Sequence, residues 1–377
     1  MSLNPAVASM GTYPFVRLAQ ARERVAARGV TLIDFGVGEP REETPAFIRR
    51  ALCEAVEAEP VSPYPTAVGM PELRAAIARW VWRRFGAQVD PDTEIVPTYG
   101  SKEAIYGLTQ IAARPGEVLA VATPGYPVPQ RSAAVAGVDV ALLPTDEAGG
   151  WLPDLDAVPW ERLAILWIAS PANPTGAVAP LAYLEEAAAR CRAAGAVLAV
   201  DEAYIELWFE SEPPPSALQL SNRTGVLSFH SLSKRSSMPG YRSGFVAGDP
   251  ALIAILRRHR PNVGTAPQRF VQHASVAAWD DDEHVAQTRS RYAAKRAALL
   301  PALQDAGLRL AGGPASFFLW LAVPGGDDEA FAARWLEQGI VLAPGSYLGA
   351  GGEGHVRVAL VPTVAECERA AELLRAG

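Results

Sequence analysis

Short apolar runs alternate with amphipathic segments in the middle of the chain, and this alternation limits the folds that it can adopt. Five runs have the length and composition of buried strands: 94–100, 117–124, 163–171, 196–204 and 225–231. Helical patterns, such as 101–113 and 181–195, stand between several of them. Continuous apolar strands separated by helices are typical of a mostly parallel sheet with helices on both faces. We therefore predict a three-layer α/β/α domain.

The pattern changes near residue 268, where a long helical tract at about 268–305 begins. It is followed by apolar runs and one further helix, at 316–324, 327–338, 340–345 and 355–362. This order predicts a smaller α+β domain, and a chain of 377 residues is long enough for two domains. We expect a large domain at 45–267, and a small domain that combines 268–377 with an N-terminal arm at 1–44.

Charge and composition exclude several classes of protein. The net charge of −7 and the pI of about 5.4 argue against a nucleic-acid partner. Cys53, Cys191 and Cys367 lie far apart without a CxxC pair, which predicts neither a disulfide framework nor a metal site. No apolar stretch reaches the roughly 18 residues that span a bilayer, and the N-terminus does not resemble a secretory signal. We expect a soluble, cytoplasmic protein without a membrane partner.

Lysine is scarce in this chain. Only Lys102, Lys234 and Lys295 occur among the 34 basic residues. Lys295 lies in an amphipathic helical pattern, and we expect it on a solvated face. Lys234 instead stands in "FHSLSKRSSMPGYRSGF" (229–245), surrounded by serines and followed by Arg242. This context makes Lys234 the leading candidate for a functional amine.

Further polar residues follow the predicted strands, and ligands of α/β sheets bind outside the carboxyl ends of strands. The residues at these positions, or at the helix start after the first strand, are Gly100, Ser101, Tyr126, Asn173, Asp201, Tyr204, Ser231 and Ser233. Together with Lys234 and Arg242 they supply an amine, an acid, phenols, an amide and donors for an anion.

That combination suits pyridoxal phosphate. A lysine such as Lys234 can bond covalently to the cofactor's aldehyde, and the cofactor then serves as an electron sink. Asp201 would keep the pyridine nitrogen protonated by pairing with it. Asn173 and Tyr204 can hydrogen-bond the ring hydroxyl, and Tyr126 can stack on the ring.

The phosphate of this cofactor needs several donors. Backbone N–H groups at the helix start near Ser101 can supply some of them. The hydroxyl groups of Ser231 and Ser233 and the forked guanidinium of Arg242 can supply the rest. The serines around Lys234 are thus explained as part of a phosphate site.

"NPTG", "DEAY" and "SLSKRSSMPGYRSG", in this order and spacing, resemble motifs of the fold-type-I, class I/II pyridoxal-phosphate aminotransferases. The resemblance covers nearly the whole chain and includes "VGEP" (37–40), "YPTAVGMPELR" (64–74) and "HVRVAL" (355–360). It implies that Lys234 holds the cofactor and that Arg357 binds the substrate α-carboxylate, with Gly38 and Asn173 beside it. It also implies a homodimer in which Tyr64 reaches the phosphate in the neighbouring subunit.

Within the family, "TYPFVRL", "GSKEAIYGL" and "HSLSKRSSMPGYRSGF" resemble the N-succinyldiaminopimelate aminotransferases of lysine biosynthesis. This resemblance implies N-succinyl-LL-2,6-diaminopimelate as amino donor and 2-oxoglutarate as the oxo-acid acceptor. Lys102 stands where many relatives carry a small residue. Its backbone can still bind phosphate, while its side chain, with Arg41 as a second candidate, can bind the substrate's distal acid.

Three other functions remain open at this stage. A broad aspartate- or aromatic-type aminotransferase would use the same cofactor residues. A β-elimination lyase would need the same lysine but no amino acceptor. A non-enzymatic regulator on this fold would carry a DNA-binding segment, and no basic helix-turn-helix pattern is present. A dinucleotide site at "FGVGEP" (35–40) is disfavoured because the third glycine of GxGxxG is missing.

Overall fold

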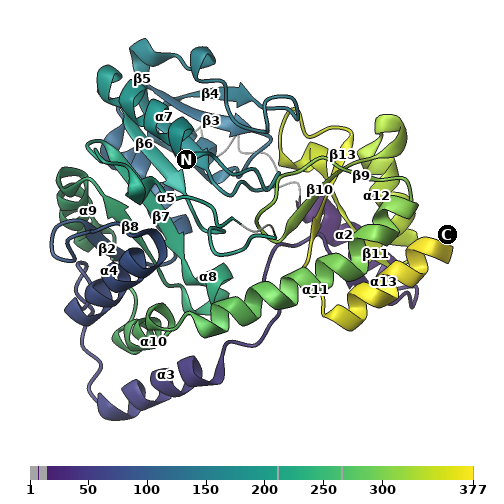
Figure 1. Cartoon of the computed structure of the whole chain (residues 1–377), viewed down its shortest axis with the longest axis horizontal. Helices are drawn as coiled ribbons and strands as arrows, with labels where there is room; N and C mark the ends of the chain where they lie inside the picture. The colour runs from purple at the N-terminus through teal and green to yellow at the C-terminus, as the bar shows by residue number, and fades with distance from the viewer. Residues whose placement is uncertain (1–6, 8–14, 210–211, 265, 377) are drawn as a thin grey trace, which may run out of the picture.

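The computed structural model describes residue 7 and residues 15–209, 212–264 and 266–376. Its largest element is a seven-stranded sheet in the order β2-β8-β7-β6-β5-β3-β4 (Figure 1). Neighbouring strands are parallel except where β8 pairs with β2 and β7. The strands are β2 (Ile95–Thr98), β3 (Val118–Thr123), β4 (Asp139–Pro144), β5 (Leu163–Ala169), β6 (Val197–Asp201), β7 (Val226–Ser231) and β8 (Gly244–Gly248).

All five predicted apolar runs form strands of this sheet, which confirms the mostly parallel arrangement. The sequence patterns missed β4 and β8. Most side chains of β4 are exposed at the edge of the sheet, so the strand lacks a continuous apolar run. β8 is short, and both its first and its last residue are glycine.

Helices cover both faces of the sheet, as the three-layer prediction requires. Val197 and Ala199 of β6 pack with α5, α6 and α9, whereas Leu198 and Val200 pack on the opposite face with α7. This alternation follows from the two-residue period of a strand. The helices around the sheet are α3 (Ala46–Ala58), α4 (Pro71–Phe85), α5 (Ser101–Ala112), α6 (Val128–Ala136), α7 (Leu181–Ala194), α8 (Leu232–Arg235), α9 (Pro250–Val263) and α10 (Arg269–Asp280).

The ends of several helices follow from single residues. Pro71 opens α4, where its missing N–H costs no hydrogen bond, and Gly86 ends it in the left-handed conformation. Left-handed glycines also end α6 and α7. Within the described ranges, no helix is both long and apolar enough to cross a membrane.

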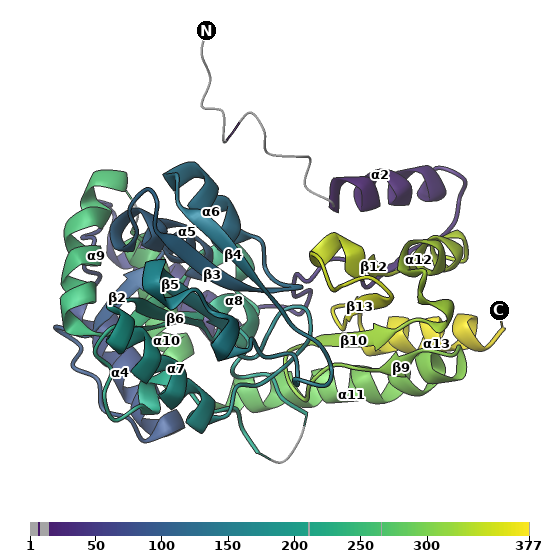
Figure 2. The ribbon, with the colours of Figure 1, turned by 90° about the horizontal axis from the view of Figure 1, so that it is seen from above.

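A second, antiparallel sheet in the order β12-β13-β10-β9 lies beside the first (Figure 2). Its strands and nearby elements are β9 (Arg309–Leu310), β10 (Phe318–Ala322), β12 (Ala343–Pro344), β13 (His355–Ala359), α2 (Phe15–Ala26), α11 (Glu283–Asp305), α12 (Asp328–Glu337) and α13 (Val364–Ala376). The N-terminal segment joins this unit because β1 (Ile33–Asp34) pairs in parallel with β11 (Ile340–Val341). Residues 1–6 and 8–14 of the expected arm lie outside the described residues, and the domain boundaries stay a prediction.

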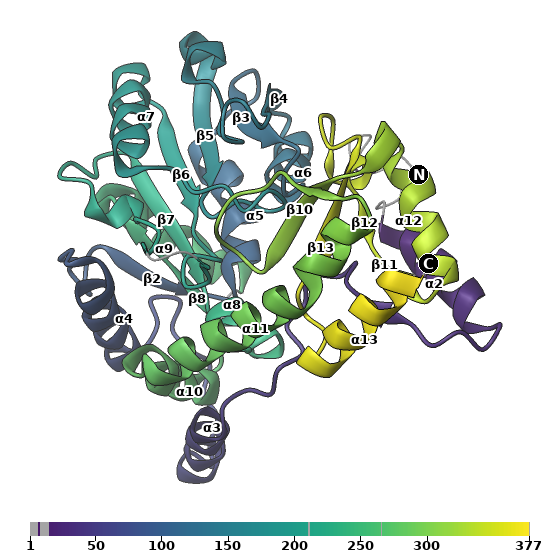
Figure 3. The ribbon, with the colours of Figure 1, turned by 45° about the vertical axis from the view of Figure 1, so that its right-hand side comes forward.

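The predicted helical tract at 268–305 is broken into α10 and α11 at Asp281 and Asp282. Asp281 has an extended backbone (φ −111°, ψ 127°), and its carboxylate accepts the backbone N–H of His284 at 2.9 Å. These contacts end one helix and cap the next. From this turn α11 runs into the small domain, as Figures 1 and 3 show.

Lys295 contradicts the prediction of a solvated helix face, because its side chain is only 1% exposed. Its Nζ lies 2.6 Å from Glu42 Oε1 and 3.4 Å from the carbonyl oxygen of Val361. The helical period of α11 did not reveal this burial, because the chain segments that cover Lys295 are distant in sequence.

We expect Lys295→Ala to lower the free energy of unfolding of the apo protein by about 3 kcal/mol, because it removes the ion partner of Glu42 and leaves a cavity. Urea denaturation measures the change. The control is Arg291→Ala, which removes a half-exposed guanidinium 3.9 Å from the same carboxylate; we expect it to cost no more than about 0.5 kcal/mol. Equal losses in the two variants would contradict a specific role for the buried pair.

Candidate active site

A cavity of about 410 Å³ opens at the carboxyl ends of β5, β6 and β7. This size suits a small ligand or cofactor. The predicted site residues on its wall are Gly38, Ser101, Lys102, Tyr126, Asn173, Asp201, Tyr204, Ser231, Ser233, Lys234, Arg242 and Arg357. Three predicted residues are absent from this wall, and one of them, Arg41, instead lies 3.6 Å from the carboxylate of Asp34. Gly100 lies against Arg242, and Tyr64 is 98% exposed.

Lys234 lies on α8, the single helical turn that follows β7, and its amine points into the cavity. Its Nζ donates a hydrogen bond to the carbonyl oxygen of Gly38 at 2.7 Å. Burial lowers the pKa of this amine to about 8, and the nearby charges of Arg357 and Arg242 act in the same direction. A larger share of the amine is therefore neutral and nucleophilic near neutral pH than in an exposed lysine.

Asp201 is the last residue of β6 and follows the alternation of that strand onto the α5 face. Burial raises the pKa of its carboxyl group to about 6, although the backbone N–H of Ala203 and the charge of Lys234 oppose this shift. The N–H···O distance from Ala203 is 3.2 Å. A cation placed against Asp201 would offset the cost of burying its charge.

The anion-binding side of the cavity consists of Ser101, Ser231, Ser233 and Arg242. Ser101 is the first residue of α5, so free backbone N–H groups and the positive end of the helix dipole point there. Ser231 and Ser233 line the wall from the end of β7 and from α8. This set of donors suits a phosphate group.

Gly100 explains how Arg242 reaches the start of α5. The glycine has a φ of +73°, and a Cβ atom built on it would lie 2.6 Å from Nη2 of Arg242. A side chain here would therefore displace the guanidinium. The guanidinium is also fixed by the carbonyl oxygen of Pro239, 2.8 Å from Nη1.

Arg357 reaches the cavity from β13 of the small domain. Its Nη1 donates to Oδ1 of Asn173 at 3.0 Å, and its Nη2 donates to the carbonyl oxygen of Gly36 at 2.8 Å. The guanidinium lies 4.4 Å from the ring centre of Phe318 and 5.3 Å from that of Phe15. These contacts hold a buried cation at the cavity, where it can bind a carboxylate through its forked N–H groups.

The comparisons with known proteins agree with this geometry. The profile of the family described as aminotransferase class I and II matches residues 30–374. The chain belongs to the class I and II aminotransferases. Members of this family use pyridoxal phosphate, which confirms the cofactor predicted from the sequence.

Several known proteins are similar to this aminotransferase over nearly their whole length. The chain is 37% identical to an LL-diaminopimelate aminotransferase of Nitratidesulfovibrio vulgaris, over 97% of this chain and 96% of that protein. A probable N-succinyldiaminopimelate aminotransferase of Thermus thermophilus is similar in structure, with a TM-score of 0.89 at 33% identity over 96% and 99% of the two chains. An aminotransferase of Neisseria meningitidis gives a TM-score of 0.90 at 35% identity, covering 99% of each chain.

The residues of this aminotransferase fit pyridoxal phosphate. The start of α5, the two serines and Arg242 suit the phosphate, and Gly100 leaves room for the guanidinium that would bind it. Asp201 needs a cation, which a protonated pyridine nitrogen would supply, and the amine of Lys234 lies in the same cavity. No group of histidine, cysteine and acidic residues in the described part of the chain could hold a metal ion.

The wall residues that sequence reasoning missed include Phe15, Glu39 and Phe318. Phe15 and Phe318 looked like ordinary apolar residues, and only the tertiary structure brings them to Arg357. Glu39 stood in the "VGEP" motif, but nothing in the sequence showed that its charge would act on Lys234. The individual roles of the predicted site residues stay predictions.

We expect Gly100→Ala to raise the dissociation constant of pyridoxal phosphate by about tenfold or more, because it strains a left-handed residue and displaces Arg242. Equilibrium titration of the apoenzyme measures this constant. Gly107→Ala is the matched control, since an added Cβ at Gly107 meets no atom within 4 Å. Unchanged affinity in Gly100→Ala would exclude the guanidinium from the phosphate site.

Proposed function

We propose that this aminotransferase moves the amino group of N-succinyl-LL-2,6-diaminopimelate to 2-oxoglutarate. The observation that carries the proposal is Lys102, an exposed cation on the cavity wall in addition to Arg357. Arg357 accounts for the α-carboxylate, so a donor with further carboxylates can use Lys102 as well. The likeness to the Thermus thermophilus protein, and the motifs around Lys234, support the same donor.

In this proposal each cavity residue has a distinct task. Arg357, held by Asn173, binds the α-carboxylate and so orients the substrate. The amine of Lys234 accepts the proton of the substrate Cα and later returns one. Asp201 would stabilise positive charge on the ring of the bound cofactor, and the ring centre of Tyr204 lies 5.9 Å from the amine of Lys234. When bound, pyridoxal phosphate supplies the electron sink and carries the amino group between the two substrates.

A second candidate donor is LL-2,6-diaminopimelate without the succinyl group. The Nitratidesulfovibrio vulgaris relative carries that name. The observation that favours it is Glu39, a carboxylate on the same wall. The distal end of the free diamino acid bears an ammonium group, which Glu39 would attract; succinylation removes that charge.

The test compares the two donors in single turnovers of the enzyme with bound cofactor, followed by the absorbance change to the amine form. We expect the succinylated donor to react fastest. Lys102→Ala should lower its kcat/KM by about tenfold, since a charged hydrogen bond is lost. Lys102→Arg keeps the positive charge and is the matched control; it should leave the kcat/KM of the succinylated donor within about twofold of the wild-type value.

Each alternative gives a different result in this assay. Faster reaction of LL-2,6-diaminopimelate, with a loss in Glu39→Gln, would establish the second candidate. Faster reaction of aspartate or tyrosine would indicate a broad aminotransferase. Release of pyruvate and ammonia from cysteine-type substrates would indicate the β-lyase.

We also propose a homodimer with shared active sites, as is typical of the family. Tyr64 is 98% exposed and Val61 is 80% exposed, so this loop has no covering partner within the described part of its own chain. A second cavity adjoins the anion-binding side and is lined by Tyr99, Lys102 and Arg242 among others. Tyr64 of a second copy can enter there and donate its hydroxyl to the phosphate.

We expect Tyr64→Phe to weaken pyridoxal phosphate binding by about fivefold, the effect of about one hydrogen bond, without changing the sedimentation of the dimer. Cofactor titration and analytical ultracentrifugation measure the two quantities. Tyr183→Phe is the control, because Tyr183 lies on α7 outside the cavity and its hydroxyl donates to the carbonyl oxygen of Pro153 at 2.7 Å. Equal cofactor affinity in the two variants would exclude the hydroxyl of Tyr64 from the site.

A further inference from the structure

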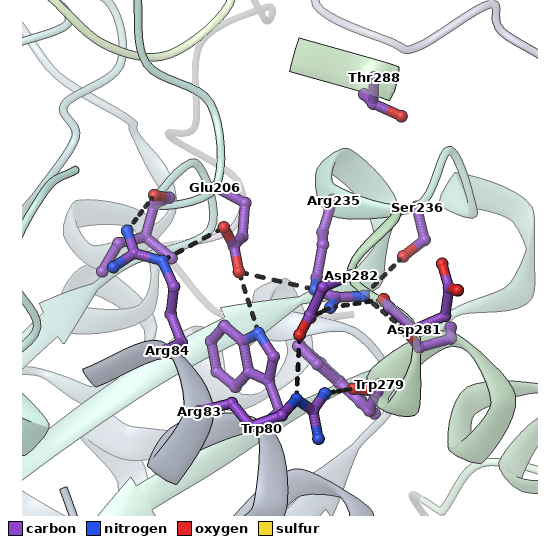
Figure 4. Close-up of polar contacts among 12 residues, drawn as sticks. Trp80, Arg83, Arg84, Glu206, Arg235, Ser236, Trp279, Asp281, Asp282 and Thr288 are labelled. Carbon is purple, nitrogen blue, oxygen red and sulfur yellow. Dashed lines mark hydrogen bonds and ion pairs between the residues drawn. The ribbon is translucent and has the colours of Figure 1, made fainter. Parts of the chain in front are cut away.

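The two residues that follow Lys234 are both buried, and both bind the turn between α10 and α11. Figure 4 shows Arg235 and Ser236 on one side and Asp281 and Asp282 on the other. The exposed fraction is 2% for Arg235 and 1% for Ser236. The short helix that carries Lys234 is therefore attached directly to the start of the helix that runs into the small domain.

Arg235 makes most of this attachment. Its Nη1 donates to the carbonyl oxygen of Ala278, and its Nη2 donates to the carbonyl oxygen of Asp281 at 3.1 Å and to Oδ1 of Asp282 at 2.9 Å. The last carbonyl groups of a helix lack partners within the helix and favour a nearby cation. Arg235 on α8 thus supplies hydrogen bonds to carbonyl oxygens at the carboxyl end of α10. Its guanidinium carbon lies 4.9 Å from the ring centre of Trp279.

Ser236 adds a second hydrogen-bonded chain to the same turn. Its Oγ lies 2.8 Å from Nε2 of His284, and Nδ1 of His284 lies 2.5 Å from Oδ1 of Asp281. Serine, histidine and aspartate in this order resemble a hydrolase triad. Both Ser236 and His284 are buried, at 1% and 5% exposure, so a substrate has no access to the hydroxyl. The chain of contacts holds the turn in place.

Glu206 links this attachment to the loop after β6, which also carries Tyr204. Its carboxylate accepts the indole N–H of Trp80 at 2.9 Å and lies 3.3 Å from Nε of Arg84 (Figure 4). The same carboxylate lies 3.7 Å from Nε of Arg235 and 3.5 Å from Nη1 of Arg289 on α11. Two of the segments that line the cavity, the loop after β6 and α8, are therefore joined to α11 by one ionic network around the buried Glu206.

We propose that Arg235 is a positioning residue for Lys234: it fastens α8 to the α10–α11 turn, so that the helix leading into the small domain sets the position of the lysine amine. The inference rests on the proposed function in one respect, namely that Lys234 is the lysine that bonds to the cofactor.

The charge of Arg235 is not what sets the ionisation of Lys234. Burial is the main cause of the lowered pKa of Lys234, followed by the charges of Glu39, Arg357, Arg242 and Asp201. The charge of Arg235 is not among these leading causes, so its loss alone should raise that pKa by much less than the one unit expected below. A changed pKa in an Arg235 variant therefore reports that the amine has moved or has become hydrated.

The test variant is Arg235→Met, which keeps an apolar stem of similar length. The pKa of Lys234 is measured in the apoenzyme by acetic anhydride labelling across pH, with the labelled peptide quantified by mass spectrometry. We expect this pKa to rise by about one unit as water reaches the amine. In the holoenzyme we expect the single-turnover rate at saturating donor to fall about tenfold. The donor concentration that gives half of this rate should stay within about twofold of the wild-type value.

The control is Arg79→Met, which removes a bidentate ion pair with Asp280, Nε–Oδ1 3.0 Å and Nη2–Oδ2 2.7 Å, at the same end of α10. Within the described part of the chain, Arg79 makes its hydrogen bonds and ion pair with Asp280 and none with α8. We expect it to leave both the pKa of Lys234 and the single-turnover rate unchanged. If Arg79→Met and Arg235→Met act equally, or if Arg235→Met lowers only the melting temperature, the proposal is overturned.

A second variant keeps the test decisive if Arg235→Met does not fold. Asp282→Asn weakens the two ion pairs of a half-exposed carboxylate, with Arg235 and with Arg83, and leaves Arg235 with its two carbonyl partners. We expect shifts in the same directions but smaller, and no change in either quantity overturns the proposal. Borohydride reduction of the holoenzyme and mapping of the tagged peptide tests the premise separately. A tag outside Lys234 rejects the proposed function, whereas a tag on Lys234 with unchanged kinetics in the variants rejects only the role of Arg235.

Discussion

Burial of the Lys234 amine where the two domains meet is the constraint on which the rest of the site depends. The amine donates to Gly38 of the N-terminal segment, and it shares its cavity with Asp201 of the large domain and Arg357 of the small domain. A buried ammonium group is costly, so its pKa falls and a neutral amine becomes available. Burial of the Lys234 amine, and with it the lowered pKa, thus requires both domains to be in place.

Opposite charges are arranged in separate parts of the cavity. Arg242 and the start of α5 lie on one side of the cavity, and Arg357 enters from the small domain. Asp201 lies at the carboxyl end of β6. This separation lets a single bound molecule carry two anionic groups and one cationic ring without placing like charges together. Under the proposed function, Lys102 and Glu39 are the charged wall residues left to distinguish one amino donor from another.

Neighbouring residues at the ends of β6 and β7 point to opposite faces of the sheet, so one lines the cavity and the next lies behind it. Asp201 and Ser231 face the cavity, and their neighbours Glu202 and His230 face the opposite side of the sheet. There Nε2 of His230 lies 3.2 Å from Oε2 of Glu202, and both side chains are buried. Arg235 and Ser236 follow Lys234 directly in the chain, and both bind the turn between α10 and α11 behind the cavity. The cofactor site is consequently held from behind by hydrogen bonds and ion pairs as well as by apolar packing.

The sequence by itself determined the parallel sheet, the cofactor chemistry and the identity of most cavity residues. Apolar runs with helical spacers dictate that architecture, and polar residues at strand ends such as Asn173 and Asp201 must converge at one edge of the sheet. Only the tertiary structure decided what depends on contacts between distant segments. Lys295 is buried because Glu42 and Val361 cover it, α10 and α11 separate at Asp281 and Asp282, and Phe15 and Phe318 enclose Arg357. Local periodicity carries no information about such partners, since burial of a side chain is set by whatever the rest of the chain places against it.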